Sequence, residues 1–259
     1  PLEVVYSVSE PEGGYTVEDT IEFCKLAEGL IDIIHLRSGE MDPQHPLGFT
    51  STEAMPTPYL EEMGQVCRAV HQLGLNMVVG ASAGFQDPDW VNRAVAEGKA
   101  DLIYMARAWI NNPDYGQKVF EGRAEDIVPC IRCNKCHVPY INGPWHNICS
   151  VNPALGQAHR LKSLVKAPGR PVKVAIIGGG VSGMEAAIVA ARRGHQVTVF
   201  EREDHLGGQM IYADHASFKW PIRNFKAWQI RQIDKLGVEV RLNVCATPEL
   251  VKAEGFDVV

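Results

Sequence analysis

The stretch VKVAIIGGGVSG, residues 172–183, decides the fold of one part of the chain. It places Gly178, Gly180 and Gly183 as G-x-G-x-x-G, directly after an apolar run and before a helical pattern. Such glycines let the backbone turn tightly and approach a pyrophosphate at a helix N-terminus. Glu201 ends the next apolar run, 21 residues after Gly180, where an acid binds the ribose hydroxyls of an adenosine. The stretch therefore predicts a Rossmann-like, dinucleotide-binding fold.

The residues that follow extend this prediction. Gly207, Gly208 and Gln209 form a second glycine turn, which belongs either to the same nucleotide site or to an ordinary loop. Arg202 would suit a 2′-phosphate, but the acid position itself holds a glutamate. A later helix is expected from Pro221, and its apolar residues share one side: Ile222, Phe225, Trp228, Ile233 and Leu236.

The first 122 residues repeat a strand–helix unit four times. Apolar runs occupy residues 2–8, 31–36, 75–80 and 101–105, and a helical pattern follows each. Such apolar strands, alternating with helices, indicate a parallel sheet covered on both faces. Four units form either a small open α/β sheet or the C-terminal half of a (β/α)8 barrel, which takes about 250 residues in full.

Helix starts in this part are predicted from capping patterns. Thr16 and Asp19 are spaced as a capping box. Thr57 and Asp87 each precede a proline, the arrangement typical of an N-cap followed by proline in the first turn. Asn112, before Pro113, is expected to open a further helix.

Four of the seven cysteines gather in one segment. They are Cys130, Cys133, Cys136 and Cys149, in the pattern C-x2-C-x2-C-x12-C. Three cysteines at three-residue steps with a fourth from a distance favour a [4Fe–4S] cluster, in which each iron takes one cysteine. Zinc and a disulfide are the alternatives, although structural zinc usually takes two separated pairs. We interpret the neighbouring His137 and His146 as surface residues.

If the first part is a half-barrel, its last two strands are the seventh and eighth, and the loops after these commonly bind phosphate. The loops contain Ala83 and Gly84, and Ala106 and Arg107. Small residues would expose backbone N–H groups, and Arg107 would add a fork of donors. The alternative is that these residues pack the mouth of the barrel, with Arg107 paired to an acid.

The loop RSGEMDPQHP, residues 37–46, follows the second apolar run. Its charged residues are candidates for substrate contact or proton transfer, the alternative being a solvated loop: Arg37, Glu40, Asp42 and His45. His35, inside the run itself, is expected to be a packed core histidine.

Composition excludes several classes of protein. The 259 residues are 46% hydrophobic and 22% charged, which fits one or two globular domains. The net charge of −6 argues against binding to nucleic acid or an anionic membrane. No apolar run approaches the ~20 residues of a membrane span. An odd number of cysteines without a leader segment predicts a reducing, cytoplasmic location. Both ends read as cut, so we expect a segment of a longer protein.

The combination resembles the iron–sulfur branch of the old yellow enzyme family, which includes 2,4-dienoyl-CoA reductase, 2-enoate reductase and trimethylamine dehydrogenase. The matching stretches are AEGKADLIYMARAWINNPD (96–114), CIRCNKC (130–136), ICSVNPA (148–154) and VAIIGGGVSGMEAA (174–187), with VFERE (199–203) and LGGQ (206–209). The resemblance implies the C-terminal half of an FMN-binding barrel over residues 1–125. It also implies a [4Fe–4S] segment and linker over 126–170, and the start of an FAD-binding domain over 171–259.

The resemblance further implies where the cofactors bind. The backbone around Ala83-Gly84 and Ala106-Arg107 would hold the FMN phosphate, and the clustered cysteines would hold the [4Fe–4S] cluster. The glycine-rich fold, with Gly208 and Gln209, would hold FAD, or ADP in an amine dehydrogenase. Electrons would pass from NAD(P)H through FAD and the cluster to FMN, which would reduce the C=C bond of an α,β-unsaturated carbonyl compound. His45 falls near the loop where the dienoyl-CoA reductases place a histidine, and is our catalytic candidate.

Two observations leave alternatives open. VVYSVSE, residues 4–10, lacks the arginine that the family usually places beside the flavin pyrimidine. The cysteine spacing matches trimethylamine dehydrogenase, so an amine dehydrogenase that passes electrons to an electron-transfer flavoprotein is the second hypothesis. The absence of aromatic residues between Arg37 and Leu47 favours the reductase, because an amine cation calls for an aromatic cage.

A non-catalytic electron-transfer subunit or fragment is the third hypothesis. We expect a small-molecule substrate and a homo-oligomer.

Overall fold

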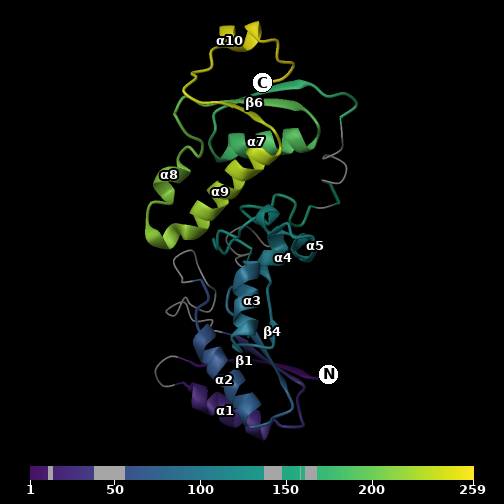
Figure 1. Ribbon diagram of the computed structural model, residues 1–259, viewed down its shortest axis with the longest axis vertical. Helices are drawn as coiled ribbons and strands as arrows, with labels where there is room; N and C mark the ends of the chain where they lie inside the picture. The colour runs from purple at the N-terminus through teal and green to yellow at the C-terminus, as the bar shows by residue number, and fades with distance from the viewer. Residues whose placement is uncertain (11–13, 38–55, 137–147, 158, 161–167) are drawn as a thin grey trace. The chain divides into compact units, whose positions relative to one another are not determined.

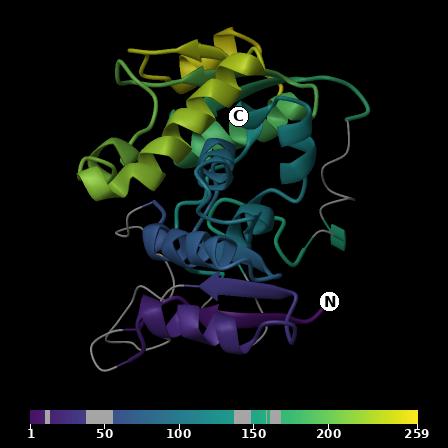
Figure 2. The ribbon, with the colours of Figure 1, turned by 60° about the horizontal axis from the view of Figure 1, so that its bottom comes forward.

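The computed structural model describes residues 1–10, 14–37, 56–136, 148–157, 159–160 and 168–259. The chain divides into two compact units (Figures 1 and 2). Unit 1 comprises Pro1–Ala124 and Arg132–Ser150, and unit 2 comprises Glu125–Ile131 and Val151–Val259. In the described ranges, no helix combines the length and the apolar character needed to span a bilayer.

Unit 1 is built on a parallel sheet whose strands follow one another in chain order. Its strands are β1 (Glu3–Ser7), β2 (Ile33–Arg37), β3 (Val78–Ser82) and β4 (Leu102–Ile103), with sheet order β1-β2-β3-β4. Its helices are α1 (Val17–Leu26), α2 (Leu60–Gln72), α3 (Pro88–Ala96), α4 (Arg107–Asn111) and α5 (Tyr115–Phe120). The predicted alternation of parallel strands and helices is confirmed.

The helices of unit 1 cover one face of this sheet. Ile34 and Leu36 of β2 and Val79 of β3 are fully buried in a core that α1 and α2 share. On the other face, Val5 and Val78 remain 54% and 41% exposed. The expected coverage of both faces is therefore wrong for the described residues. Right-handed crossovers between strands in sequential order place every connecting helix on the same side, which explains the difference.

Two of the predicted helix starts are confirmed. Asp19 and Thr16 form a reciprocal capping box, in which the Asp19 N–H donates to Thr16 Oγ1 and the Thr16 N–H donates to Asp19 Oδ2. Asp87 accepts from the N–H of Asp89, and Pro88 is the first residue of α3.

The other two predicted starts are wrong. Helix α2 begins at Leu60, because Tyr59 has a φ of +60°, which lies outside the right-handed helical path, and Thr57 caps nothing. The helix expected to open at Asn112 is α5, which begins at Tyr115. The short helix α4 precedes it, and its N-cap residue makes no side-chain hydrogen bond, so no capping pattern in the sequence indicates it.

Unit 2 has a second parallel sheet, of order β5-β6-β7. Its strands are β5 (Lys173–Ile177), β6 (Gln196–Phe200) and β7 (Glu239–Arg241), and Val258 bridges to the free side of β5. Its helices are α7 (Val181–Arg192), α8 (Met210–Ala213), α9 (Trp220–Lys235) and α10 (Pro248–Ala253). Helices α7 and α9 pack against each other beside β6 (Figures 1 and 2). The apolar side predicted for α9 lies in this core: Ile222, Phe225, Trp228, Ile233 and Leu236.

Candidate functional site

The turn between β5 and α7 has a backbone that only glycine can follow. Gly178 has a φ of +97°, and its N–H donates to the carbonyl of Phe200 at the end of β6 (2.8 Å). A Cβ on Gly183 would lie 1.9 Å from the Gly178 carbonyl oxygen, so α7 can pack this closely only with glycine there. Gly180 is the N-cap of α7, and a Cβ on it would meet nothing nearer than 4.0 Å.

Glu201 is buried beside this turn. Its Oε2 accepts from the N–H of Gly179 (2.6 Å), and its Oε1 accepts from the N–H of Glu203 (3.0 Å). Burial disfavours the ionised carboxyl, but hydrogen bonds from the backbone of Glu203, Gly179 and Arg202 outweigh it, and they hold the Glu201 pKa below its ordinary value. The carboxylate thus braces the glycine turn, a role that the spacing alone did not reveal.

Four of the predicted nucleotide residues of unit 2 lie around one cavity of about 490 Å³, whereas Gly180 and Gly183 are not among the residues that line it. Gly178, Glu201, Gly208 and Gln209 all line it, at the carboxyl ends of β5 and β6. The Gly207 N–H donates to the Gly179 carbonyl (2.9 Å), which joins the second glycine turn to the first. The cavity and the bare glycine backbone at its edge fit a dinucleotide, because side chains at these positions would fill the space that a pyrophosphate needs.

All four clustered cysteines lie in described parts of the chain, and none of them is joined in a disulfide. The boundary between the units falls inside the motif, and Cys130 is counted with unit 2 whereas the other three belong to unit 1. In unit 1, the Cys133 Sγ lies 3.3 Å from the hydroxyl of Ser150, the residue after Cys149. Four cysteine side chains outside disulfides are the donor set that an iron–sulfur cluster takes.

The cysteine loop, residues 132–136, is tied to the carboxyl end of the unit 1 sheet through two arginines. Arg132 is only 1% exposed, and its Nη2 donates to the carbonyls of Gly84 (2.7 Å) and Pro56. Arg107 Nη1 donates to Asn134 Oδ1 (2.7 Å). Sequence reasoning missed Arg132, because an arginine between two cysteines is ordinarily expected at the surface.

The residues predicted to hold a flavin phosphate follow two adjacent strands. Ala83 and Gly84 come directly after β3, and Ala106 precedes α4 after β4. Gly84 has a φ of +70°, and the Ala83 side chain is fully buried, so the backbone is the part of this loop that fits a phosphate. Arg107, instead of pairing with an acid through this nitrogen, donates to an amide oxygen of the cysteine loop.

Of the candidates for substrate contact or proton transfer on the loop after β2, only Arg37 lies in the described residues. Arg37 ends β2 and is half-buried, whereas Glu40, Asp42 and His45 lie outside the described residues, as do His137 and His146.

His35 is not a simple core histidine. Its ring stacks on Tyr104, with centroids 3.7 Å apart, and its Nε2 lies 2.7 Å from the Ser82 hydroxyl on the face that the helices leave open. Burial lowers the His35 pKa, and the nearby Glu3 opposes that shift.

Within the described residues, Cys67, His71 and Asp101 form one group of possible metal ligands whose atoms lie within 4.8 Å of one another. Burial raises the pKa of the Cys67 thiol to about 11, so the thiol is protonated at neutral pH. His71 pairs with Asp101 (3.1 Å), and Asp101 also accepts from the N–H of Val79. We interpret the group as a buried thiol beside a hydrogen bond between His71 and Asp101, which holds α2 to the start of β4.

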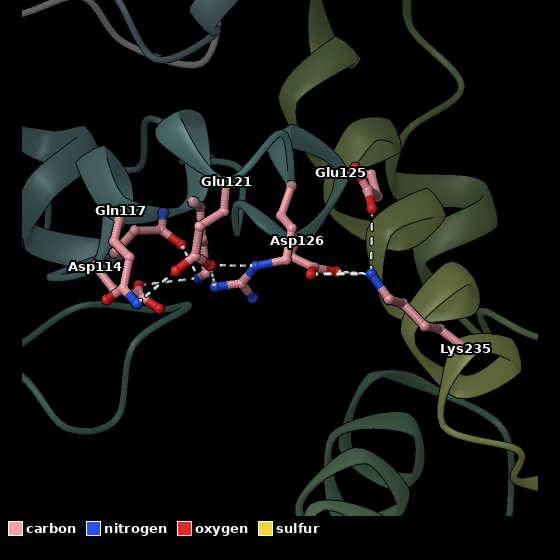
Figure 3. Close-up of polar contacts among 9 residues, drawn as sticks. Asp114, Gln117, Glu121, Glu125, Asp126 and Lys235 are labelled. Atoms are coloured by element: carbon pink, nitrogen blue, oxygen red, sulfur yellow. Dashed lines mark hydrogen bonds and ion pairs between the residues drawn. The ribbon is translucent and has the colours of Figure 1, made fainter.

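In unit 2, the segment leading to Cys130 is anchored to α9. Figure 3 shows Lys235 pointing at two carboxylates, and its Nζ lies 2.8 Å from Asp126 Oδ1 and 3.1 Å from Glu125 Oε1. Gln232 also donates to the buried Asp126. The chain is therefore fixed four residues before the first cysteine.

Comparisons with known proteins agree with this geometry. Residues 173–238 match the family model of FAD-dependent oxidoreductases. An NADH oxidase of Thermoanaerobacter brockii is 33% identical over 100% of this chain and 39% of its own length. A cinnamate reductase of Clostridium sporogenes is 37% identical over 67% of this chain and 26% of its own length.

A solved structure of a 2-naphthoyl-CoA reductase in complex with 2-naphthoyl-CoA is 31% identical and superposes with a TM-score of 0.88. The match covers 100% of this chain and 39% of that one. The chain thus spans two fifths or less of the length of these relatives. It belongs to the family of NADH:flavin oxidoreductases that includes the 2-enoate reductases and the trimethylamine dehydrogenase-like enzymes.

Proposed function

We propose that the protein is an ene-reductase that moves electrons from NAD(P)H through FAD and a [4Fe–4S] cluster to FMN. The substrate would be an α,β-unsaturated carbonyl compound, as an enoate or an enoyl- or dienoyl-CoA thioester. One observation carries the proposal. The same chain has a cavity beside the glycine turn that fits a dinucleotide, and a cysteine loop whose Arg132 is hydrogen-bonded to Gly84, in the segment expected to hold a flavin phosphate.

Unit 1 would be the C-terminal half of a (β/α)8 barrel. Strands in sequential order with helices on one face are what an arc of such a barrel requires, and Val5 and Val78 would point into its interior. A doubly wound open sheet would instead have a point where the strand order reverses, and helices on both faces.

In unit 2, Gly178, Gly180 and Gly183 would bring the backbone and the N-terminus of α7 to the pyrophosphate of FAD. Glu201 would accept hydrogen bonds from the ribose hydroxyls, because its two carboxylate oxygens have acceptor capacity beyond the backbone N–H groups that they already serve. The depressed pKa of Glu201 keeps it ionised for this task.

Cys130, Cys133, Cys136 and Cys149 would each bind one iron, and the loops at residues 83–84 and 106–107 would hold the FMN phosphate. When bound, FAD would accept hydride from NAD(P)H, the cluster would carry single electrons, and FMN would give hydride to the substrate. His45 is our candidate for the group that protonates the substrate α-carbon.

The test uses the full-length protein, purified without oxygen. NADH should bleach the flavin absorbance promptly, and cinnamate or an enoyl-CoA should restore it. Bleaching by a methylated amine with no response to NADH would contradict the reductase and support the amine dehydrogenase, which the cysteine spacing also fits. A protein without flavin would overturn both, and would leave the electron-transfer subunit or fragment.

A further inference from the structure

Arg132 occupies a backbone conformation that does not suit its residue type. Its φ is +53°, in the left-handed region that favours glycine, and yet its long side chain is fully buried. A strained backbone around a buried charged side chain persists only where the contacts of that side chain offset the strain. The contacts of Arg132 therefore indicate what the residue does.

Those contacts join two loops that are far apart in sequence. The Arg132 guanidinium donates to the carbonyl of Gly84, in the loop after β3, and to the carbonyl of Pro56, just before α2. A planar guanidinium can serve two carbonyls in fixed directions, which a lysine ammonium cannot do with the same rigidity.

A second contact fixes the same cysteine loop. Asn134 also has a left-handed φ, of +56°, and its Oδ1 accepts from Arg107 at the start of α4. The cysteine loop is thus fastened to the loops after both β3 and β4, the two loops that fit the flavin phosphate.

We propose that Arg132 is a positioning residue that couples the flavin-phosphate loop to the cysteine loop, so that the FMN and the cluster strengthen each other's binding. The coupling rests on the proposed function, since it needs both groups. It would operate because an ordered cluster holds Arg132 in place, and Arg132 in turn holds the carbonyl of Gly84, in the loop that would bind the phosphate. By linkage, the effect is reciprocal and has the same size in both directions.

The experiment measures this reciprocity in the full-length protein. FMN affinity is determined with the cluster present and after iron removal by a chelator. The affinity for iron, from equilibrium competition with the chelator, is then compared with and without FMN. In the wild type, we expect loss of the cluster to weaken FMN binding about tenfold, within the usual range of such couplings.

Arg132→Gly is the informative variant, because glycine adopts a φ of +53° without strain, and the loop can keep its path while the guanidinium is lost. We expect iron and FMN to bind but the coupling factor to fall toward one. Arg132→Lys keeps the positive charge but lacks the planar guanidinium, so it should also lower the coupling factor. This variant keeps the test available if the glycine variant does not fold. Lys135→Ala, which removes an exposed positive charge from the same loop, is the matched control and should retain the coupling.

An unchanged coupling factor in both Arg132 variants would overturn the inference. A wild-type protein that contains no iron or no FMN would instead refute the proposed function, so the two failures are distinguishable.

Discussion

The glycines of the turn after β5 differ in what a side chain would meet. At Gly183, an added Cβ would run into the backbone of the turn itself, whereas at Gly180 it would find open space. Packing therefore requires glycine at position 183, whereas at position 180 the proposed FAD pyrophosphate would be the reason for glycine. That contrast separates a folding defect from a binding defect.

We predict that Gly180→Ala folds normally but loses FAD, because a methyl group would take the space of the pyrophosphate. Gly183→Ala should lower the melting temperature as well, because α7 must move away from β5. Flavin content and thermal unfolding of the two variants check this. Gly169→Ala, at a position with no neighbour within 4 Å, is the control. Full FAD retention in Gly180→Ala would contradict the assigned site.

At this scale, the sequence could predict residues whose role depends on the backbone and on spacing. Gly178, Gly183 and Glu201 were found in this way, and the structure brings them together at one turn. The structural role of Arg132 could not be predicted, because it depends on carbonyls 48 and 76 residues away.

At the scale of the elements, the start of a helix depends on both its capping residue and the backbone conformation of the residues before it. Asp87 and Thr57 both precede a proline, but only Asp87 caps a helix. The left-handed Tyr59 delays α2 to Leu60, and no residue type in this stretch signals that turn, so the sequence could not reveal it. Strands β1 to β6 were predictable to within a few residues, because apolar runs set them, whereas the short β7 (Glu239–Arg241) was not predicted.

We predict that Asp87→Ala lowers the stability of unit 1 by about 1 kcal/mol, the usual cost of losing an N-cap. Thr57→Ala is the matched control and should change stability little, since Thr57 caps nothing. Thermal or denaturant unfolding of the two variants measures the difference. Equal losses would show that the contact between Asp87 and Asp89 does not stabilise α3.

At the scale of the whole molecule, the open face of the unit 1 sheet is the feature that calls for further chain. Parallel sheets are ordinarily buried on both faces, and here one face carries exposed valines and a histidine–serine–tyrosine cluster. The parallel α/β class was evident from the sequence, whereas the one-sided covering depends on the order of the strands, which sequence patterns do not fix.

We predict that Val78→Asp destabilises the full-length protein by about 3 kcal/mol, the order of the cost of burying a polar group without a partner. This follows if Val78, 41% exposed here, lies inside a closed barrel. Leu26→Asp, at an 80% exposed position at the end of α1, should have little effect. Similar small effects for both variants would argue for an open sheet.

The left-handed backbone at Arg132 also has an evolutionary consequence. Glycine would relieve the strain there at once, so random drift would replace the arginine unless selection acted on its side chain. The identity of this one residue should therefore divide the family's members into two groups. Those with arginine would have inherited interdependent cofactors, and those with glycine would lose one cofactor without loosening the other.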